Sequence, residues 1–136
     1  MNISVIGAGY VGLITGIGFA KLNHQVSIVD LNDDLIKNLN ENRPPFYEPE
    51  LVDYLNDSNI RNNLFFSTSY QKSINENTDI VFVCVQTPTD PDTGKTKTDY
   101  ISSALTELKK IESFNFIICI KSTIKAVSYT HLRAHE

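Results

Sequence analysis

The chain has little cysteine, no long apolar run and no excess of positive charge. Its 136 residues include two cysteines, Cys84 and Cys119, and carry a formal net charge of −4. Two cysteines do not make a zinc-ligand spacing, and both stand in apolar, strand-like segments. We therefore expect buried, reduced thiols rather than a disulfide or a metal site. The acidic balance argues against nucleic acid and anionic membranes as partners.

No apolar run approaches the roughly 20 residues that a membrane-spanning helix needs. The N-terminus lacks the basic segment of a secretory signal peptide and opens directly into a strand-like segment. These absences predict a cytoplasmic protein without a membrane partner. There is no internal repeat or low-complexity segment, and the 41% hydrophobic and 21% charged residues are ordinary for a globular domain.

Three glycines near the N-terminus form the most informative pattern. Gly7, Gly9 and Gly12 follow the apolar segment 3–6 and precede a helical segment. In such a G-x-G-x-x-G turn, the first glycine permits a tight turn and the second lets the backbone approach a diphosphate. The third lets the helix pack closely on the sheet. The diphosphate then sits at the helix N-terminus, near free N–H groups and the positive end of the helix dipole.

An acidic residue, Asp30, ends the next apolar segment, 26–29, and lies 18 residues after Gly12. A carboxylate at this place can accept hydrogen bonds from both ribose hydroxyls of an adenosine, and it repels the 2′-phosphate of NADP. A charged hydrogen bond of this kind contributes roughly 1.5–3 kcal/mol. These residues predict NAD as the cofactor, although FAD is compatible with them as well.

Apolar and amphipathic segments alternate along the chain, which predicts a parallel sheet with helices on both faces. The expected strands are 3–6, 26–29, 64–67, 79–85 and 116–120, the last two of them buried. The expected helices are 10–22, 32–39, a short helix starting at Pro49, 69–75 and 100–111. Right-handed crossovers give the strand order 3-2-1-4-5. The predicted fold class is α/β, a Rossmann-like, doubly wound parallel sheet that is incomplete at its C-terminal end.

Two further segments emerge at the carboxyl edge of this sheet, where ligands of such folds bind. They are Thr87–Thr89, after the fourth strand, and Lys121–Thr123, after the fifth. Threonine hydroxyls and free backbone N–H groups there would meet the nicotinamide half of a dinucleotide. On spacing alone, a plain turn explains Thr87–Thr89 equally well.

The sequence resembles the UDP-glucose/GDP-mannose dehydrogenase family, and most of all its UDP-glucose branch. The resemblance covers residues 1–124 and rests on four motifs in the family's order: Gly7–Leu13, Tyr47–Pro49, Thr87–Asp90 and Lys121–Thr123. It implies that the full-length protein is a homo-oligomer that oxidises the C6 alcohol of UDP-glucose to UDP-glucuronate in two steps with two NAD. By position, it assigns NAD contacts to Gly7, Gly9, Tyr10, Val11, Gly12, Asp30, Thr87, Thr89 and Thr123.

Two positions depart from the family's pattern. Leu35 stands where a basic residue near the adenosine ribose is common, and Lys125 stands where proline is usual. The resemblance also implies that the catalytic cysteine, its assisting lysine and asparagine, and the UDP-sugar site lie further along than this chain extends. Cys84 and Cys119 do not match the catalytic motif. We therefore expect no catalytic residue in this chain and no turnover by it alone.

The last ten residues, 127–136, neither continue the family's pattern nor show apolar periodicity. They match the translation of a transposon-type adapter used in sequencing libraries, and residue 126 is the alanine that the adapter's preceding bases would complete. We expect a truncated NAD-binding domain over residues 1–125 and a non-native, read-through tail over 126–136. On this interpretation the histidines of the tail form no metal site.

Two alternative functions share part of this pattern. A dehydrogenase acting on UDP-N-acetyl-mannosamine or GDP-mannose would carry the same motifs, because the sugar-binding part distinguishes these enzymes. A regulatory NAD-sensing domain of a potassium-uptake system also opens with a strand, a glycine turn and an acid. Such domains lack the Thr87–Asp90 and Lys121–Thr123 motifs.

Overall fold

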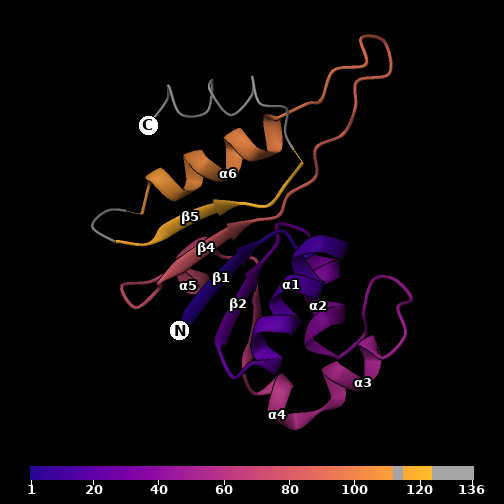
Figure 1. Ribbon diagram of the computed structural model, residues 1–136, viewed down its shortest axis with the longest axis vertical. Helices are drawn as coiled ribbons and strands as arrows, with labels where there is room; N and C mark the ends of the chain where they lie inside the picture. The colour runs from indigo at the N-terminus through magenta and orange to yellow at the C-terminus, as the bar shows by residue number, and fades with distance from the viewer. Residues whose placement is uncertain (112–114, 124–136) are drawn as a thin grey trace.

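Five parallel strands form one sheet in the computed structural model, which describes residues 1–111 and 115–123 (Figure 1). The strands are β1 (Asn2–Ile6), β2 (Gln25–Val29), β3 (Leu64–Ser67), β4 (Ile80–Val83) and β5 (Ile117–Ile120). Their order is β3-β2-β1-β4-β5, and each pair of neighbours is parallel. The predicted fold class and strand order are confirmed.

Helices cover both faces of the sheet. One face carries α1 (Tyr10–Lys21), α2 (Asp33–Asn40), α3 (Leu51–Asn56) and α4 (Ser58–Arg61), and the other carries α5 (Tyr70–Ser73) and α6 (Asp99–Lys109). The chain runs outward from β1 to β3 and then returns past β1 to β4. The reversal of strand order therefore falls between β1 and β4, which is where doubly wound sheets bind ligands.

The side chains of the central strands alternate between two apolar cores. Ile3 and Val5 of β1 belong to the core under α1 to α4, whereas Ile6 belongs to the core under α5 and α6. In β4, Val81 and Val83 are fully buried. Burial on both faces explains why these strands read as nearly continuous apolar runs rather than as alternating ones. In the described part of the chain, no helix is long and apolar enough to cross a membrane.

Several predicted boundaries differ from the structure by one or two residues, and two of these differences have a clear physical reason. The helix expected to start at Pro49 begins at Leu51, because Glu50 adopts a left-handed backbone conformation with φ of 67° and cannot join the helix. The strand expected over 79–85 ends at Val83, since the neighbouring strand β1 ends at the same level of the sheet. The short helix α4 was not predicted, because its 4 residues carry no helical periodicity.

The predicted burial of the fifth strand was also wrong. Ile117 and Ile118 are 67% and 43% exposed, and Cys119 is exposed as well, whereas Cys84 is buried as expected. Within the described residues β5 pairs with β4 on one side and stands at the edge of the sheet. An apolar sequence does not reveal whether a further layer covers a strand. Lys125 and the predicted tail, 126–136, lie outside the described residues.

Candidate cofactor-binding cleft

The glycine turn between β1 and α1 has a backbone that excludes side chains at two positions. Gly7 has a φ of +100°, and a Cβ there would lie 2.7 Å from the carbonyl oxygen of Cys84. A Cβ at Gly12 would lie 1.8 Å from the carbonyl oxygen of Gly7. The absence of a side chain at Gly12 therefore lets α1 pack directly against the backbone of the turn. Both glycines are required by protein packing, as the motif predicts.

Gly9 has a different environment. A Cβ at Gly9 would meet no atom within 4 Å, so no part of the described protein requires a glycine there. Gly9 is the N-cap of α1, and the first turn of this helix has neither a side-chain cap nor an acidic residue. The N–H groups of a first helical turn have no partners within the helix. This open helix start is suited to an anion that approaches the backbone closely.

Two backbone N–H groups, one earlier and one later in the chain, hold the carboxylate of Asp30 in place at the end of β2. Its Oδ2 accepts a hydrogen bond of 2.8 Å from the N–H of Ala8, within the glycine turn. Its Oδ1 accepts one of 3.0 Å from the N–H of Asn32, which caps α2. Each carboxylate oxygen retains a second acceptor site. Asp30 can therefore position the turn and accept hydrogen bonds from ribose at the same time.

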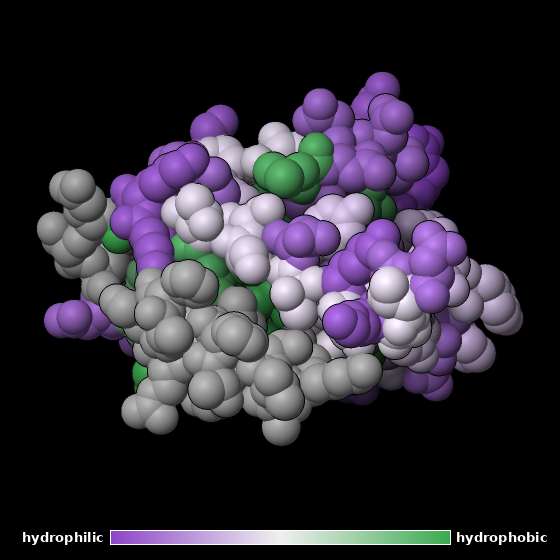
Figure 2. All heavy atoms as spheres, turned by 90° about the horizontal axis from the view of Figure 1, so that it is seen from above, coloured by the Kyte–Doolittle hydropathy of each residue, from purple (hydrophilic) through white to green (hydrophobic). Residues whose placement is uncertain are grey.

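A cleft of about 640 Å³ opens beside these residues, at the reversal of strand order. Gly7, Gly9 and Asp30 line it, and its walls are the loop after β2, α6 and the end of β4. Seen from above, apolar atoms lie recessed between more polar ones near the middle of the coloured surface (Figure 2). The cleft thus brings together the residues predicted to hold the diphosphate and the adenosine ribose.

The other predicted contacts on α1 do not line this cleft. Tyr10 and Val11 are 56% and 45% exposed, and Gly12 is buried under the turn. The hydroxyl of Tyr10 donates a hydrogen bond of 3.3 Å to Oε2 of Glu48, and its ring lies 5.1 Å from that of Phe46. The Tyr47–Pro49 motif therefore packs beside the start of α1, and the assignment of NAD contacts to Tyr10 and Val11 stays a prediction.

The three predicted threonines stand at the same edge of the sheet but outside the cleft. Thr87 and Thr89 belong to the loop after β4, which projects from the molecule (Figure 1), and Thr123 follows β5. The hydroxyl of Ser122 joins the two strand ends, since it donates a hydrogen bond of 2.7 Å to the carbonyl oxygen of Val85. Sequence reasoning did not assign this positioning role to Ser122.

Asp90 organises the projecting loop. Its Oδ1 accepts the N–H groups of Asp92 at 2.9 Å and of Thr93 at 3.0 Å, and these hydrogen bonds lower the pKa of its carboxyl group. Its backbone N–H donates to the carbonyl oxygen of Lys95 at 2.7 Å, and its carboxylate lies 3.3 Å from Nζ of Lys97. The aspartate of the Thr87–Asp90 motif is therefore a structural residue of this loop.

Two titratable groups in the cleft are held neutral. Burial raises the pKa of Tyr70 to about 12, and the carboxylates of Glu107 and Asp30 add to the rise. Burial raises the pKa of the Cys84 thiol to about 11, while the Lys121 cation opposes this effect. A thiol that stays protonated at neutral pH is a weak nucleophile. Within the described residues, no group of three or more His, Cys, Asp or Glu side chains could hold a metal ion.

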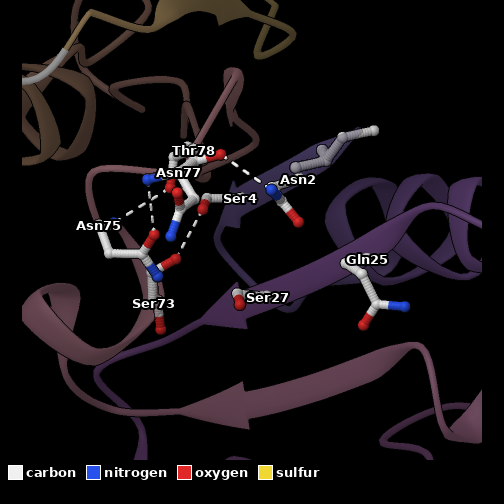
Figure 3. Close-up of a pocket in the computed structure, with 9 residues that line it drawn as sticks. Asn2, Ser4, Gln25, Ser27, Ser73, Asn75, Asn77 and Thr78 are labelled. Atoms are coloured by element: carbon white, nitrogen blue, oxygen red, sulfur yellow. Dashed lines mark hydrogen bonds between the residues drawn. The ribbon is translucent and has the colours of Figure 1, made fainter.

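A smaller hollow of about 200 Å³ lies at the opposite edge of the sheet, near the amino ends of β1 and β2 (Figure 3). Neutral polar side chains line it, among them Ser4, Ser27 and Asn75. Oγ of Ser4 donates a hydrogen bond of 2.6 Å to the carbonyl oxygen of Ser73. Oγ of Ser73 is buried and has no hydrogen-bond partner among the described residues. This hollow offers no charged side chain to a dinucleotide.

A glycine turn that opens a helix, a carboxylate at the end of β2 and a cleft at the reversal of strand order define a dinucleotide-binding Rossmann domain. Residues 1–134 match the family model described as the UDP-glucose/GDP-mannose dehydrogenase family, NAD binding domain. The chain belongs to this family, and its cofactor is NAD.

Curated relatives include UDP-glucose 6-dehydrogenases of Bacillus subtilis and Rickettsia typhi, which are 33% and 35% identical to this chain over 124 and 135 residues. These matches cover 91% and 99% of this chain but 28% and 31% of those proteins. An uncharacterised protein of Methanocaldococcus jannaschii is 39% identical over 126 residues, which are 91% of this chain and 14% of that protein. The chain therefore spans less than a third of each of these relatives.

Solved structures of the same family have the same fold. The GDP-mannose dehydrogenase from Pseudomonas aeruginosa superposes with a TM-score of 0.86 at 26% identity, over 96% of this chain and 30% of that one. A UDP-glucose dehydrogenase from Pyrobaculum islandicum superposes with a TM-score of 0.81 at 32% identity, over 90% of this chain and 28% of that one. A UDP-D-ManNAc dehydrogenase from Pyrococcus horikoshii superposes with a TM-score of 0.85 at 26% identity, over 98% of this chain and 31% of that one.

Proposed function

We propose that this chain is the NAD-binding part of a UDP-glucose 6-dehydrogenase. Family membership makes it the NAD-binding domain of a nucleotide-sugar dehydrogenase. The narrower assignment to UDP-glucose is supported by the curated relatives of that name, which are 33–35% identical to this chain. The oxidation of UDP-glucose belongs to the full-length protein, for which we also propose a homo-oligomeric state.

The carboxylate of Asp30, which is fixed by the Ala8 N–H and lines the cleft together with Gly9, is the observation that supports NAD at this site most directly. We infer that the ribose hydroxyls of the adenosine bind Asp30 and that the diphosphate lies over Gly9 at the open start of α1. We assign the nicotinamide half to the side of Thr87, Thr89 and Thr123. When bound, NAD accepts a hydride from the alcohol carbon of the sugar.

The charges of the cleft favour NAD over NADP. Among the described residues that line it, the charged side chains are Asp30 and Glu107, and both are acidic. Neither offers a cation to a 2′-phosphate, and both repel one. The two charges of the diphosphate are instead met by the backbone N–H groups and the dipole of α1.

Neither cysteine of this chain is placed for the second oxidation. That step passes through an aldehyde, which a cysteine thiolate can capture covalently. The Cys84 thiol is buried with a raised pKa, and Cys119, although exposed, lies on β5 and does not line the cleft. We therefore propose that the catalytic and sugar-binding groups belong to the remainder of the full-length protein, and that this chain alone turns over no sugar.

An assay of the full-length gene product tests the proposal. Purified protein is mixed with NAD and, in separate reactions, with UDP-glucose, UDP-N-acetyl-mannosamine or GDP-mannose, and NADH is followed by its absorbance. We expect two NADH per UDP-glucose and much slower reaction with the other sugars. Preferred oxidation of another sugar would overturn the assignment to UDP-glucose but not membership of the family. The 136-residue chain serves as the inactive control.

We also propose that residues 126–136 are a sequencing read-through and that the native sequence in this chain ends at Lys125. The family match extends to residue 134, whereas the read-through interpretation makes residues 126–136 non-native. A single experiment decides between the two. Genomic DNA is amplified across codon 125 and sequenced. We expect a different continuation there, whereas codons for the same tail in the genome would refute the proposal.

A further inference from the structure

The residues of α6 that line the cleft are spaced as one face of a helix. Tyr100, Ser103, Ala104 and Glu107 line the cleft, and they occupy positions i, i+3, i+4 and i+7 of the helix. Ala104 is buried in the core, whereas Tyr100 is 55% exposed. One face of α6 is therefore turned partly toward the cleft, and the longer side chains on it are free to contact a ligand.

The order of the other lining residues indicates which part of NAD reaches this wall. The diphosphate is assigned to Gly9 and the adenosine ribose to Asp30, so the base attached to that ribose lies further along the cleft. Leu31 and Leu35, which follow Asp30 in the chain, line the cleft together with α6. Leu31 is 74% exposed although it is a large apolar residue. An exposed leucine that lines a cleft provides an apolar surface on which an aromatic base can pack.

Glu107 is the charged residue on this wall. Its Oε1 accepts a hydrogen bond of 2.5 Å from Nζ of Lys110, on the outer side of the helix. An ionised carboxylate has about four acceptor sites, so Glu107 can accept a further hydrogen bond while it pairs with Lys110. Glu107 lines the same cleft as Asp30 and Tyr70. The raised pKa of Tyr70, which is due chiefly to burial and to a lesser extent to these two carboxylates, is consistent with this placement.

We propose that Glu107 recognises the adenine of bound NAD by accepting a hydrogen bond from its 6-amino group. This inference rests on the placement of the ribose at Asp30 proposed above. A carboxylate accepts hydrogen bonds and cannot donate them when ionised. It therefore favours a base with an amino group at this position and disfavours hypoxanthine, which carries a carbonyl oxygen there. Glu107 would thus determine base specificity while taking no part in the hydride transfer.

The contact between Glu107 and Lys110 does not by itself explain the position of the glutamate. The side chains of this pair are 38% and 60% exposed, and an exposed ion pair three residues apart on a helix contributes little to stability. The same pairing could be made by a glutamate on the outer face of α6. The placement of Glu107 on the face that lines the cleft is what a ligand contact requires.

Binding of two dinucleotides to this chain tests the proposal. The dissociation constants for NAD and for nicotinamide hypoxanthine dinucleotide are measured by calorimetry with the unaltered chain, Glu107→Ala, Lys110→Ala and Glu76→Ala. Lys110→Ala separates loss of the ion pair from loss of the carboxylate. Glu76→Ala removes an equal charge from an exposed position outside the cleft. Circular dichroism confirms that each variant is folded.

We expect the unaltered chain to prefer NAD by about tenfold, the effect of one hydrogen bond to a charged acceptor. Glu107→Ala should abolish this preference, while Lys110→Ala and Glu76→Ala should retain it. An unchanged preference in Glu107→Ala, with NAD still bound, would overturn the role of Glu107 alone. If the 136-residue chain binds neither dinucleotide, the same four proteins are compared at full length, and absence of NAD binding there would overturn both this role and the placement of NAD in the cleft.

Discussion

The backbone N–H of Ala8 donates a hydrogen bond of 2.8 Å to Oδ2 of Asp30, although the two residues are 22 positions apart. This contact ties the glycine turn after β1 to the end of β2, so that the expected diphosphate and ribose sites are held at a constant separation. The carboxylate that we propose as a cofactor contact therefore also shapes the site. Substitutions of Asp30 should therefore affect stability as well as affinity.

Replacing Asp30 by alanine should lower both the NAD affinity and the stability of the protein. We expect Asp30→Ala to weaken NAD binding at least tenfold and to lower the free energy of unfolding by about 1–2 kcal/mol, because the Ala8 N–H loses its acceptor. Asp30→Asn retains an acceptor oxygen and should keep most of the stability. Calorimetry and urea unfolding measure the two quantities. Full stability of Asp30→Ala would show that the contact with Ala8 is dispensable.

Substitutions of two glycines in the turn should have different effects, one on stability and the other on NAD binding. Gly12→Ala places a Cβ 1.8 Å from a backbone oxygen, and such overpacking should cost about 3 kcal/mol or more. Gly9→Ala meets no protein atom and should leave the melting temperature nearly unchanged, yet it should weaken NAD binding. Thermal unfolding with and without NAD provides the comparison. Equal NAD affinity in Gly9→Ala would argue against a diphosphate at this position.

The raised pKa of Tyr70 predicts a loss of stability at high pH. The pKa of tyrosine rises from its ordinary value of 10.0 to about 12 in the folded protein, chiefly through burial. Below pH 10 the hydroxyl is protonated in both states, and its stabilising effect is fully present. Between pH 10 and 12 the unfolded state loses the proton first, so the free energy of unfolding falls as the pH rises.

Urea unfolding at pH 8, 10 and 11 checks this expectation. Tyr70→Phe should show a smaller decline with pH than the unaltered chain, because it cannot ionise. Tyr47→Phe is the matched control, since Tyr47 is 91% exposed. If Tyr70→Phe and the unaltered chain declined in parallel, burial of this hydroxyl would not be a source of the alkaline sensitivity.

The two cysteines should differ in reactivity. Cys119 is exposed and should be alkylated by iodoacetamide in the folded protein, whereas Cys84 is buried with a pKa raised to about 11 and should react only after unfolding. Peptide mapping by mass spectrometry, with and without urea, measures the modification of each thiol. Rapid labelling of Cys84 in the folded Cys119→Ser variant would contradict the burial of that thiol.

The serines of the small hollow should respond in opposite ways. Oγ of Ser73 is buried without a partner, so Ser73→Ala should be neutral or should raise the free energy of unfolding by up to about 1 kcal/mol. Ser4→Ala removes a donor at 2.6 Å from the carbonyl oxygen of Ser73 and should lower it by about 1 kcal/mol or more. Urea unfolding of both variants tests the pair. A large destabilisation by Ser73→Ala would reveal a partner for its hydroxyl.

The cofactor site could be predicted in outline because its main parts are local. Gly7 and Gly12 are dictated by the backbone geometry of one turn, and the position of Asp30 follows from the length of one βαβ unit. The contact of Asp30 with Ala8, the hydroxyl of Ser122 between two strand ends and the face of α6 that carries Glu107 gave no signal in the sequence. Each depends on how segments distant in the chain come together.

The sequence by itself determined the α/β class and the strand order, and its motifs predicted the cofactor. Apolar periodicity and turn residues are local properties, and right-handed crossovers leave few ways to connect such segments. The tertiary structure decided which surfaces are covered. Apolar residues on β4 and β5 look alike in the sequence, yet Val81 is fully buried and Ile117 is 67% exposed. Burial depends on neighbours supplied by the whole fold, and β5 stands at the edge of the described sheet.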